Sequence, residues 1–159
     1  MRHVDIWTDG ASKGNPGPGG YGIVIKYRED DGAEVRKEMK AAFSMTTNNK
    51  MEVLSAIVAL KSLDEPSEVT LTSDSQYLVK AFNDGWIDSW IKSDFRRGKK
   101  DEVKNIELWE ELIELTKKHK VSFVWVRGHA DNVENERCDT LANIAIKEMS
   151  EIRDGEKQE

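Results

Sequence analysis

The sequence predicts an α/β protein with a five-stranded mixed β-sheet flanked by helices, and two observations carry this prediction. The N-terminal part contains three strand-like apolar segments, at residues 3–9, 21–28 and 34–43, separated by turn-forming residues. From residue 47 onward, helix-like and strand-like segments alternate. Hairpin strands followed by such alternation indicate an antiparallel meander that continues into a mixed sheet. A chain of 159 residues with 38% hydrophobic residues suits one domain of this kind.

The first three strands are defined by the turns between them. The first strand ends at Asp9, and the glycine- and proline-rich segment 10–20 follows it. The second and third strands are separated by Asp30-Asp31-Gly32, which is typical of a hairpin turn. We therefore expect three adjacent antiparallel strands.

The second half alternates between the two kinds of element, and each is bounded by breakers or by a change of period. The expected order is helix 47–63, strand 68–73, helix 75–82, helix 103–118, strand 121–127 and helix 133–149. Residues 151–159 show no periodicity and are expected to form a disordered acidic tail. The predicted domain therefore comprises residues 1–150.

The composition excludes several classes of protein. Cys138 is the only cysteine, so an intrachain disulfide and a cysteine-based zinc site are ruled out. The longest apolar stretch, residues 53–60, is too short to cross a bilayer, and no basic-then-apolar leader opens the chain. We expect a cytoplasmic protein without membrane association. The net charge of −6 argues against a nucleic-acid partner, but residues 91–105 are locally basic.

Four acidic residues occupy contexts that favour other residue types, namely Asp9, Glu52, Asp74 and Asp139. Asp9 and Asp74 each end a strand-like apolar segment. Glu52 is the only charged residue between residues 51 and 60, and Asp139 interrupts the apolar face of the last helix. Taken singly, each has an ordinary explanation as a turn, a helix cap or part of a solvated face. Together, adjacent strand ends and two helices packed on the sheet can place all four at one edge. Such carboxylates resist ionisation unless cations neutralise them.

A carboxylate cluster of this kind suits the hydrolysis of a phosphodiester. Two magnesium ions about 3.5–4 Å apart can activate a water and stabilise the leaving alkoxide. Magnesium prefers hard oxygen ligands, and Asp9 is the candidate to bridge both ions because it is central. His129 lies in a glycine-flanked loop that could move over the site and pass a proton during product release. The alternative is an incidental loop histidine.

Six segments, in order, resemble type 1 ribonuclease H, most closely the bacterial form. They are Trp7-Thr8-Asp9-Gly10, Gly14-Asn15-Pro16-Gly17, residues 46–52, residues 73–77, Gly128-His129-Ala130 and residues 134–139. The resemblance runs from about residue 3 to 146 and implies the ribonuclease H-like fold. It also implies an endonuclease that cuts the RNA strand of an RNA–DNA hybrid, leaving 5′-phosphate and 3′-hydroxyl ends. In the family, the matching acids hold two magnesium or manganese ions, and the histidine matching His129 assists turnover.

The resemblance also implies substrate contacts. Minor-groove hydrogen bonds come from residues matching Asn15, Asn48, Asn49 and Gln76, and Thr47 matches a contact to a DNA phosphate. RNA displays its 2′-hydroxyls in a wide minor groove, which short amides can contact irrespective of sequence. We therefore expect cleavage that is nearly sequence-independent.

The segment at about 86–105 matches the basic handle of the family. Its candidate DNA contacts are Trp86, Trp90, Arg96, Arg97, Lys99, Lys100 and Asn105. The alternative for Trp86 and Trp90, four residues apart, is that they anchor one helix in the core, with the lysines on a solvated face. Acidic residues within the segment dilute its positive charge.

Three other functions are open. Another nuclease of the same fold would share the acids but not the asparagine-rich set of residues that is expected to contact the minor groove. A hybrid-binding module without catalysis is a second alternative, but four acids that no metal neutralises would oppose the binding of nucleic acid. A ribonuclease H domain released from a reverse transcriptase is disfavoured because Met1 directly precedes the first strand. We expect a monomer with no obligate protein partner.

Overall fold

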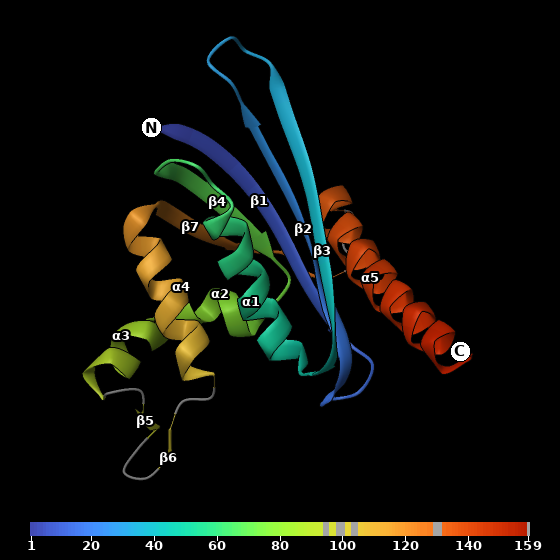
Figure 1. Ribbon diagram of the computed structural model, residues 1–159. Helices are drawn as coiled ribbons and strands as arrows, with labels where there is room; N and C mark the ends of the chain where they lie inside the picture. The colour runs from blue at the N-terminus through green and yellow to red at the C-terminus, as the bar shows by residue number, and fades with distance from the viewer. Residues whose placement is uncertain (94–95, 98–100, 103–104, 129–131, 159) are drawn as a thin grey trace.

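The protein is built on a five-stranded mixed sheet with the strand order β3-β2-β1-β4-β7 (Figure 1). The computed structural model describes residues 1–93, 96–97, 101–102, 105–128 and 132–158. β1 (Arg2–Ser12), β2 (Gly17–Arg28) and β3 (Glu34–Thr46) pair antiparallel. β4 (Ser67–Ser73) lies parallel to β1, and β7 (Lys120–Trp125) lies parallel to β4. The predicted mixed sheet is confirmed.

The turn between β1 and β2 is shorter than the sequence suggests. β1 continues through Ser12 and β2 starts at Gly17, so the expectation of a turn over residues 10–20 was wrong. The glycines of β2 serve close packing instead. A Cβ atom on Gly22 would overlap the carbonyl oxygen of Cys138, so the absent side chain lets a helix approach the strand.

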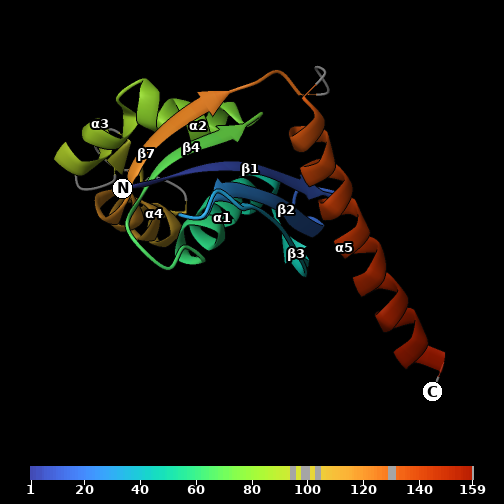
Figure 2. The same cartoon turned by 90° about the horizontal axis from the view of Figure 1, so that it is seen from above.

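In the described parts of the chain, five helices flank the sheet. They are α1 (Asn48–Lys61), α2 (Gln76–Asn83), α3 (Trp86–Lys92), α4 (Ile106–Lys118) and α5 (Val133–Gln158). α1 to α4 contribute to one large apolar core, whereas α5 forms a smaller one with β1 and β2. Figure 2 shows α5 standing apart from the other helices. In the part of the chain that the structure describes, no helix is long and apolar enough to cross a membrane.

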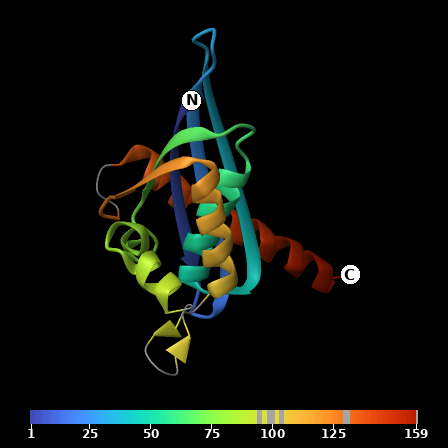
Figure 3. The same cartoon turned by 90° about the vertical axis from the view of Figure 1, so that its left-hand side faces the viewer.

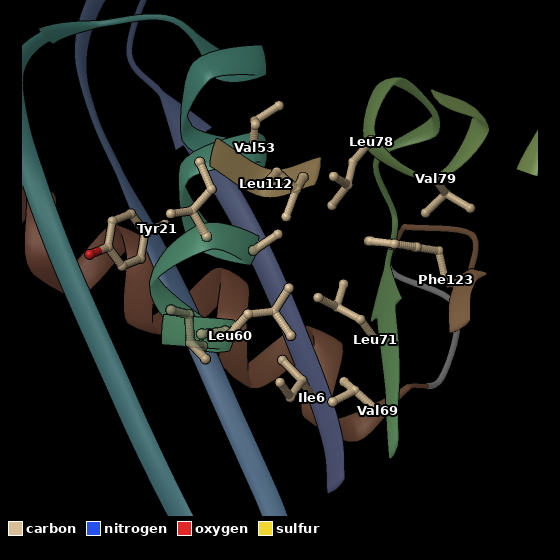
Figure 4. Packing of buried hydrophobic residues seen from close by; sticks show 14 of the residues in the cluster. Ile6, Tyr21, Val53, Leu60, Val69, Leu71, Leu78, Val79, Leu112 and Phe123 are labelled. Atoms are coloured by element: carbon tan, nitrogen blue, oxygen red, sulfur yellow. The ribbon is translucent and has the colours of Figure 1, made fainter. Parts of the chain in front are cut away.

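The alternation of side chains along the strands separates the two cores. On β1, Ile6 belongs to the large core and Trp7 to the smaller one. Figure 4 shows Ile6, Leu60 and Leu71 in the large core, between the sheet and α1. Trp109 on α4 is fully buried at the side of this core that faces α2 and α3. The large core therefore fixes the positions of β1, β4 and α1 relative to one another.

The C-terminal segment is helical where disorder was expected. α5 continues to Gln158, and Figure 2 shows its C-terminal part extending past the sheet. Residues 151–158 show no apolar periodicity, but most of them are good helix formers that prolong an existing helix at little cost. Absence of periodicity therefore did not mean absence of structure.

The segment that resembles a handle contains more secondary structure than the sequence suggested. α3 forms its first part, and the strands β5 (Arg96–Arg97) and β6 (Asp101–Glu102) pair antiparallel. Figure 3 shows these two short strands, in yellow, at one end of the molecule beyond the main sheet. α4 starts at Ile106, three residues later than expected.

Candidate active site

Three of the predicted acids meet where β1 and β4 approach the start of α1. One carboxylate oxygen from each of Asp9, Glu52 and Asp74 lies within 4.8 Å of the others. The register of the two parallel strands accounts for two of them, since Thr8 pairs with Ser73 and the next residues are Asp9 and Asp74. Glu52 reaches the same point from the first turns of α1.

Asp139 approaches the cluster from the opposite side of the sheet. It lies in the second turn of α5 and lines a pocket of about 400 Å³ together with the other three acids. Its negative charge contributes to raising the pKa of Asp9. All four predicted acids therefore border one cavity, with Asp139 as its outer member.

Gly10 connects two of the carboxylates. Its backbone N–H donates to Asp9 Oδ1 and to Glu52 Oε1, each at 2.9 Å. A Cβ atom at Gly10 would lie 2.8 Å from the backbone nitrogen of Glu52, so a side chain here would push α1 away from β1. The missing side chain is what allows Glu52 to reach Asp9 on β1.

Burial and mutual repulsion hold protons on this cluster. Burial, followed by the charge of Asp74, raises the pKa of Asp9 to about 8. Burial, followed by the charges of Asp9 and Asp74, raises the pKa of Glu52 well above its ordinary value. In the absence of a cation, the cluster therefore carries fewer than its full negative charges at neutral pH.

The cluster fits a divalent cation. Glu52 is 2% exposed, and its Oε2 atom is buried without a hydrogen-bond partner in the described structure. An unpaired buried carboxylate oxygen is costly, and a cation would remove that cost. The donor set consists of hard oxygen atoms, which divalent magnesium and manganese accept.

The amides predicted to contact substrate border the same cavity. Asn48, Asn49 and Gln76 line it at the starts of α1 and α2. Asn15 lies at the edge, where its Oδ1 accepts a hydrogen bond of 3.1 Å from the backbone N–H of Asn48. Thr47 is the N-cap of α1, and its Oγ1 accepts from the backbone N–H of Lys50 at 3.2 Å.

The loop after β7 begins at the site. A Cβ atom on Gly128 would lie 3.0 Å from Asp74 Oδ2, and Trp125 Nε1 donates to the backbone oxygen of Asp74 at 3.1 Å. His129 itself lies outside the described residues, so its role stays a prediction.

The two tryptophans of α3 differ in their surroundings. The ring centroid of Trp90 lies 5.1 Å from that of the buried Trp109, and Trp90 packs on the large core. Trp86 is 37% exposed and contacts Trp90 with a centroid distance of 6.3 Å. The core-anchor interpretation thus describes Trp90, whereas Trp86 is partly exposed to solvent.

The remaining handle residues are placed in part. The backbones of Arg96 and Arg97 form β5, but their side chains lie outside the described part, as do Lys99 and Lys100 entirely. Asn105 adopts a left-handed conformation with φ of 61° before α4, a conformation asparagine tolerates well. Its Nδ2 donates to Tyr77 Oη at 3.4 Å.

Tyr77 is a cavity residue that the sequence analysis did not single out. It lines the pocket beside Gln76, and its Oη also accepts from Trp109 Nε1 at 3.0 Å. This bond ties the wall of the cavity to the core. The signal was available, because Tyr77 directly follows Gln76 in a segment already marked by Asp74.

Comparison with known proteins gives consistent matches. The family model described as RNase H matches residues 1–147. A ribonuclease H from Lachnoclostridium phytofermentans is 51% identical over 143 residues, which cover 89% of this chain and 90% of that protein. Among solved structures, LC9-RNase H1, a type 1 RNase H with the type 2 active-site motif, matches with a TM-score of 0.82 and 31% identity, over 92% of this chain and 73% of that one. LC11-RNase H1 in complex with RNA/DNA hybrid matches with a TM-score of 0.63 and 26% identity, over 92% and 98%.

Proposed function

This chain belongs to the ribonuclease H family, and from that membership we propose that it hydrolyses the RNA strand of RNA–DNA hybrids. The cut is endonucleolytic and largely independent of sequence, and it leaves 5′-phosphate and 3′-hydroxyl ends. The observation that carries the proposal is the meeting of Asp9, Glu52 and Asp74 within 4.8 Å, with a buried oxygen on Glu52 that has no hydrogen-bond partner among the described residues. A related enzyme crystallised with an RNA/DNA hybrid supports the choice of substrate.

We propose that the four acids hold two magnesium ions, for which manganese can substitute. When bound, such ions activate a water and stabilise the leaving alkoxide. The residues of the chain prepare the site for them. Gly10 fixes one oxygen of Asp9 and one of Glu52, and no other described residue forms a competing hydrogen bond to the buried Glu52 Oε2. The oxygens are therefore held close together before any cation binds.

The substrate-binding part of the proposal rests on the amides beside the acids. Asn48, Asn49 and Gln76 border the cavity and carry both donors and acceptors, which suits hydrogen bonds to 2′-hydroxyls and base edges in the minor groove. Asn15 holds the backbone of Asn48 in place. The Thr47 hydroxyl accepts from Lys50, so its own proton is available to a DNA phosphate.

We further propose that Trp86 and the basic residues of the segment 86–105 hold the DNA strand. The partial exposure of Trp86 supports this, since aromatic rings and cations together bind nucleic acids. Replacing Arg96, Arg97, Lys99 and Lys100 by glutamine should weaken hybrid binding and flatten its dependence on salt, by up to about 0.9 in logarithmic slope for each phosphate that the variant no longer neutralises. An unchanged salt slope would show that this segment does not bind the phosphates.

The function is tested by cleavage of an end-labelled RNA strand in an RNA–DNA hybrid, with magnesium or with EDTA. Single-stranded RNA, duplex RNA and duplex DNA are run alongside, and His129→Ala shows whether the histidine speeds turnover. Magnesium-dependent cutting of the hybrid alone is the expected result. Cutting of duplex DNA or DNA junctions would indicate another nuclease of this fold. Binding without cutting under any divalent metal would indicate a non-catalytic binding module.

The proposal also includes a monomer that acts in the cytoplasm without an obligate protein partner. The mass in solution, measured by light scattering on a sizing column, tests the monomer. Cleavage by the purified chain alone tests the absence of a required partner.

A further inference from the structure

Asp139 is held differently from the other three acids of the site. Asp9 and Asp74 are fixed by paired strands, and Glu52 by the close approach of α1 to β1. Asp139 projects from a helix, and a helical aspartate can adopt more than one side-chain rotamer. Its direction must therefore come from polar contacts around it.

Asn143 supplies those contacts from one helical turn further along α5. Its Nδ2 atom donates to the backbone oxygen of Asp139 at 2.9 Å and to Asp139 Oδ1 at 3.3 Å. Residues four apart lie on the same face of a helix, so the two side chains can meet without distortion. Asn143 therefore engages one of the two carboxylate oxygens of Asp139.

Lys13 acts on Asn143 from a distant part of the chain. Its Nζ atom donates to Asn143 Oδ1 at 2.7 Å, across 130 residues of sequence. Lys13 lies in the turn between β1 and β2, where its backbone N–H donates to the oxygen of Pro18 at 2.7 Å. The turn thus places the Lys13 backbone where its ammonium group reaches α5.

The ammonium group determines which way the Asn143 amide faces. A lysine ammonium donates and never accepts, so the oxygen of the amide must point toward Lys13. The NH₂ group then points toward Asp139, where both partners are acceptors. The opposite orientation would place two donors together and would leave the amide oxygen against two acceptor oxygens. Lys13 therefore selects the orientation in which Asn143 can hold Asp139.

We propose that Asn143, oriented by Lys13, is a positioning residue that holds the Asp139 carboxylate ready for a divalent cation. This inference rests on the proposed function, because it assigns Asp139 to the cation site. Outer contacts of this kind fix the direction of a metal ligand and strengthen metal binding. Two polar side chains from separate parts of the fold, Lys13 and Asn143, thereby orient the carboxylate of Asp139.

The inference is separable from an ordinary structural role, because the two predict opposite effects of one variant. Asparagine is a poorer helix former than alanine, so Asn143→Ala should leave the melting temperature unchanged or raise it. If Asn143 positions Asp139, the same variant should bind cations more weakly. A loss of cation affinity without a loss of stability would not follow from damage to the helix.

The test is a titration of magnesium into the metal-free protein without nucleic acid, followed by NMR shifts of residues around the site. Asn143→Ala should bind magnesium roughly 10-fold more weakly, at the lower end of the range for outer contacts to metal ligands. Thr140→Ala, an exposed position next to Asp139 on the same helix, is the matched control and should bind normally. Equal affinity in Asn143→Ala and in the unaltered protein would overturn the proposal.

The role of Lys13 is tested in the same titration. Lys13→Met should weaken magnesium binding by a smaller factor, about 3-fold, and Lys13→Arg should restore it because a guanidinium also donates. In the Asn143→Ala background, Lys13→Met should have no further effect, since residues that act through one contact are not additive. An equal effect of Lys13→Met in both backgrounds would overturn the part assigned to Lys13.

Failure of the proposed function would look different from failure of this inference. The titration contains no hybrid, so it reports on Asp139 even if the protein cuts some other substrate. If the unaltered chain cuts no hybrid while Asn143→Ala still loses affinity for magnesium, the positioning role stands and the substrate assignment falls. If the unaltered chain cuts the hybrid while Asn143→Ala binds magnesium as tightly as the unaltered chain, the substrate assignment stands and the positioning role falls.

Discussion

The two sides of the active site are built on different principles. Asp9, Glu52 and Asp74 are placed by strand register and by a glycine contact, beside a large apolar core. Asp139 arrives on α5, which packs over a smaller core and is linked to β2 and β3 by ion pairs of Lys26, Arg36, Glu38, Glu134 and Arg137. Backbone geometry therefore fixes three acids, and side-chain contacts at the surface fix the fourth. Salt should therefore act on the second side more than on the first.

The largest expected effect on activity comes from substituting Asp9, on the side of the site that the sheet places. Asp9→Asn should lower hybrid cleavage by roughly 10³-fold or more, because the variant lacks a proposed cation ligand, and bound cations stabilise the transition state by several kcal/mol. Hybrid binding should survive. In the absence of metal, the variant should melt at a higher temperature, because a buried carboxylate that repels Asp74 has been replaced by a neutral amide. Calorimetry and single-turnover cleavage measure the two effects, and substantial retained cleavage would contradict the assignment.

Gly22→Ala should displace the α5 side while the sheet side stays in place. The new methyl group would meet the backbone oxygen of Cys138, which has little freedom to move, so α5 must shift. Overpacking of this kind costs about 1–3 kcal/mol. Urea unfolding measures the decrease in stability, and NMR shifts should change along α5 and at Asp139 more than at Asp9. Gly128→Ala, whose methyl group would approach the side chain of Asp74 instead, is the matched control for the sheet side.

The same division separates what was predictable from the sequence. Asp9 and Asp74 could be assigned to one site because both end apolar segments of the sequence, and Glu52 because it is a charge in an apolar helical stretch. The link from Lys13 to Asn143 spans 130 residues between two polar side chains, and no local pattern marks it. The extension of β1 and β2 through their glycines was missed because glycine ordinarily indicates a turn, whereas here it permits close packing.

Acid should destabilise the core side first, through His119. This residue is 3% exposed, and its Nδ1 accepts from the backbone N–H of Ser67 at 3.1 Å. Burial, followed by the charge of Lys118, lowers the pKa of His119 below 6.5, so the unfolded chain takes up the proton at a higher pH than the folded one does. Stability should therefore fall as the pH drops below about 6.5, by at most about 1.4 kcal/mol per pH unit. Urea unfolding at several pH values checks this, and His119→Gln should flatten the profile between pH 6.5 and 5.

The smallest expected effect tests the ion pairs of α5. Hydrogen bonds from Arg137, and then from Arg36, lower the pKa of Glu38 to about 2, so its stabilising contribution is complete above pH 4.5 and disappears as the pH falls toward 2. Glu38→Gln should cost about 1 kcal/mol at neutral pH and low salt, since the side chain is partly exposed and its ion pairs are screened. This cost should shrink in 1 M salt, whereas the cost of Gly22→Ala should not.

Lys117 provides the control, because its ion pair with Glu114 lies away from α5. Lys117→Gln should leave the NMR shifts around Asp139 unchanged, whereas Glu38→Gln should move them. Identical shifts in both variants would mean that the ion pairs do not help to place the fourth acid.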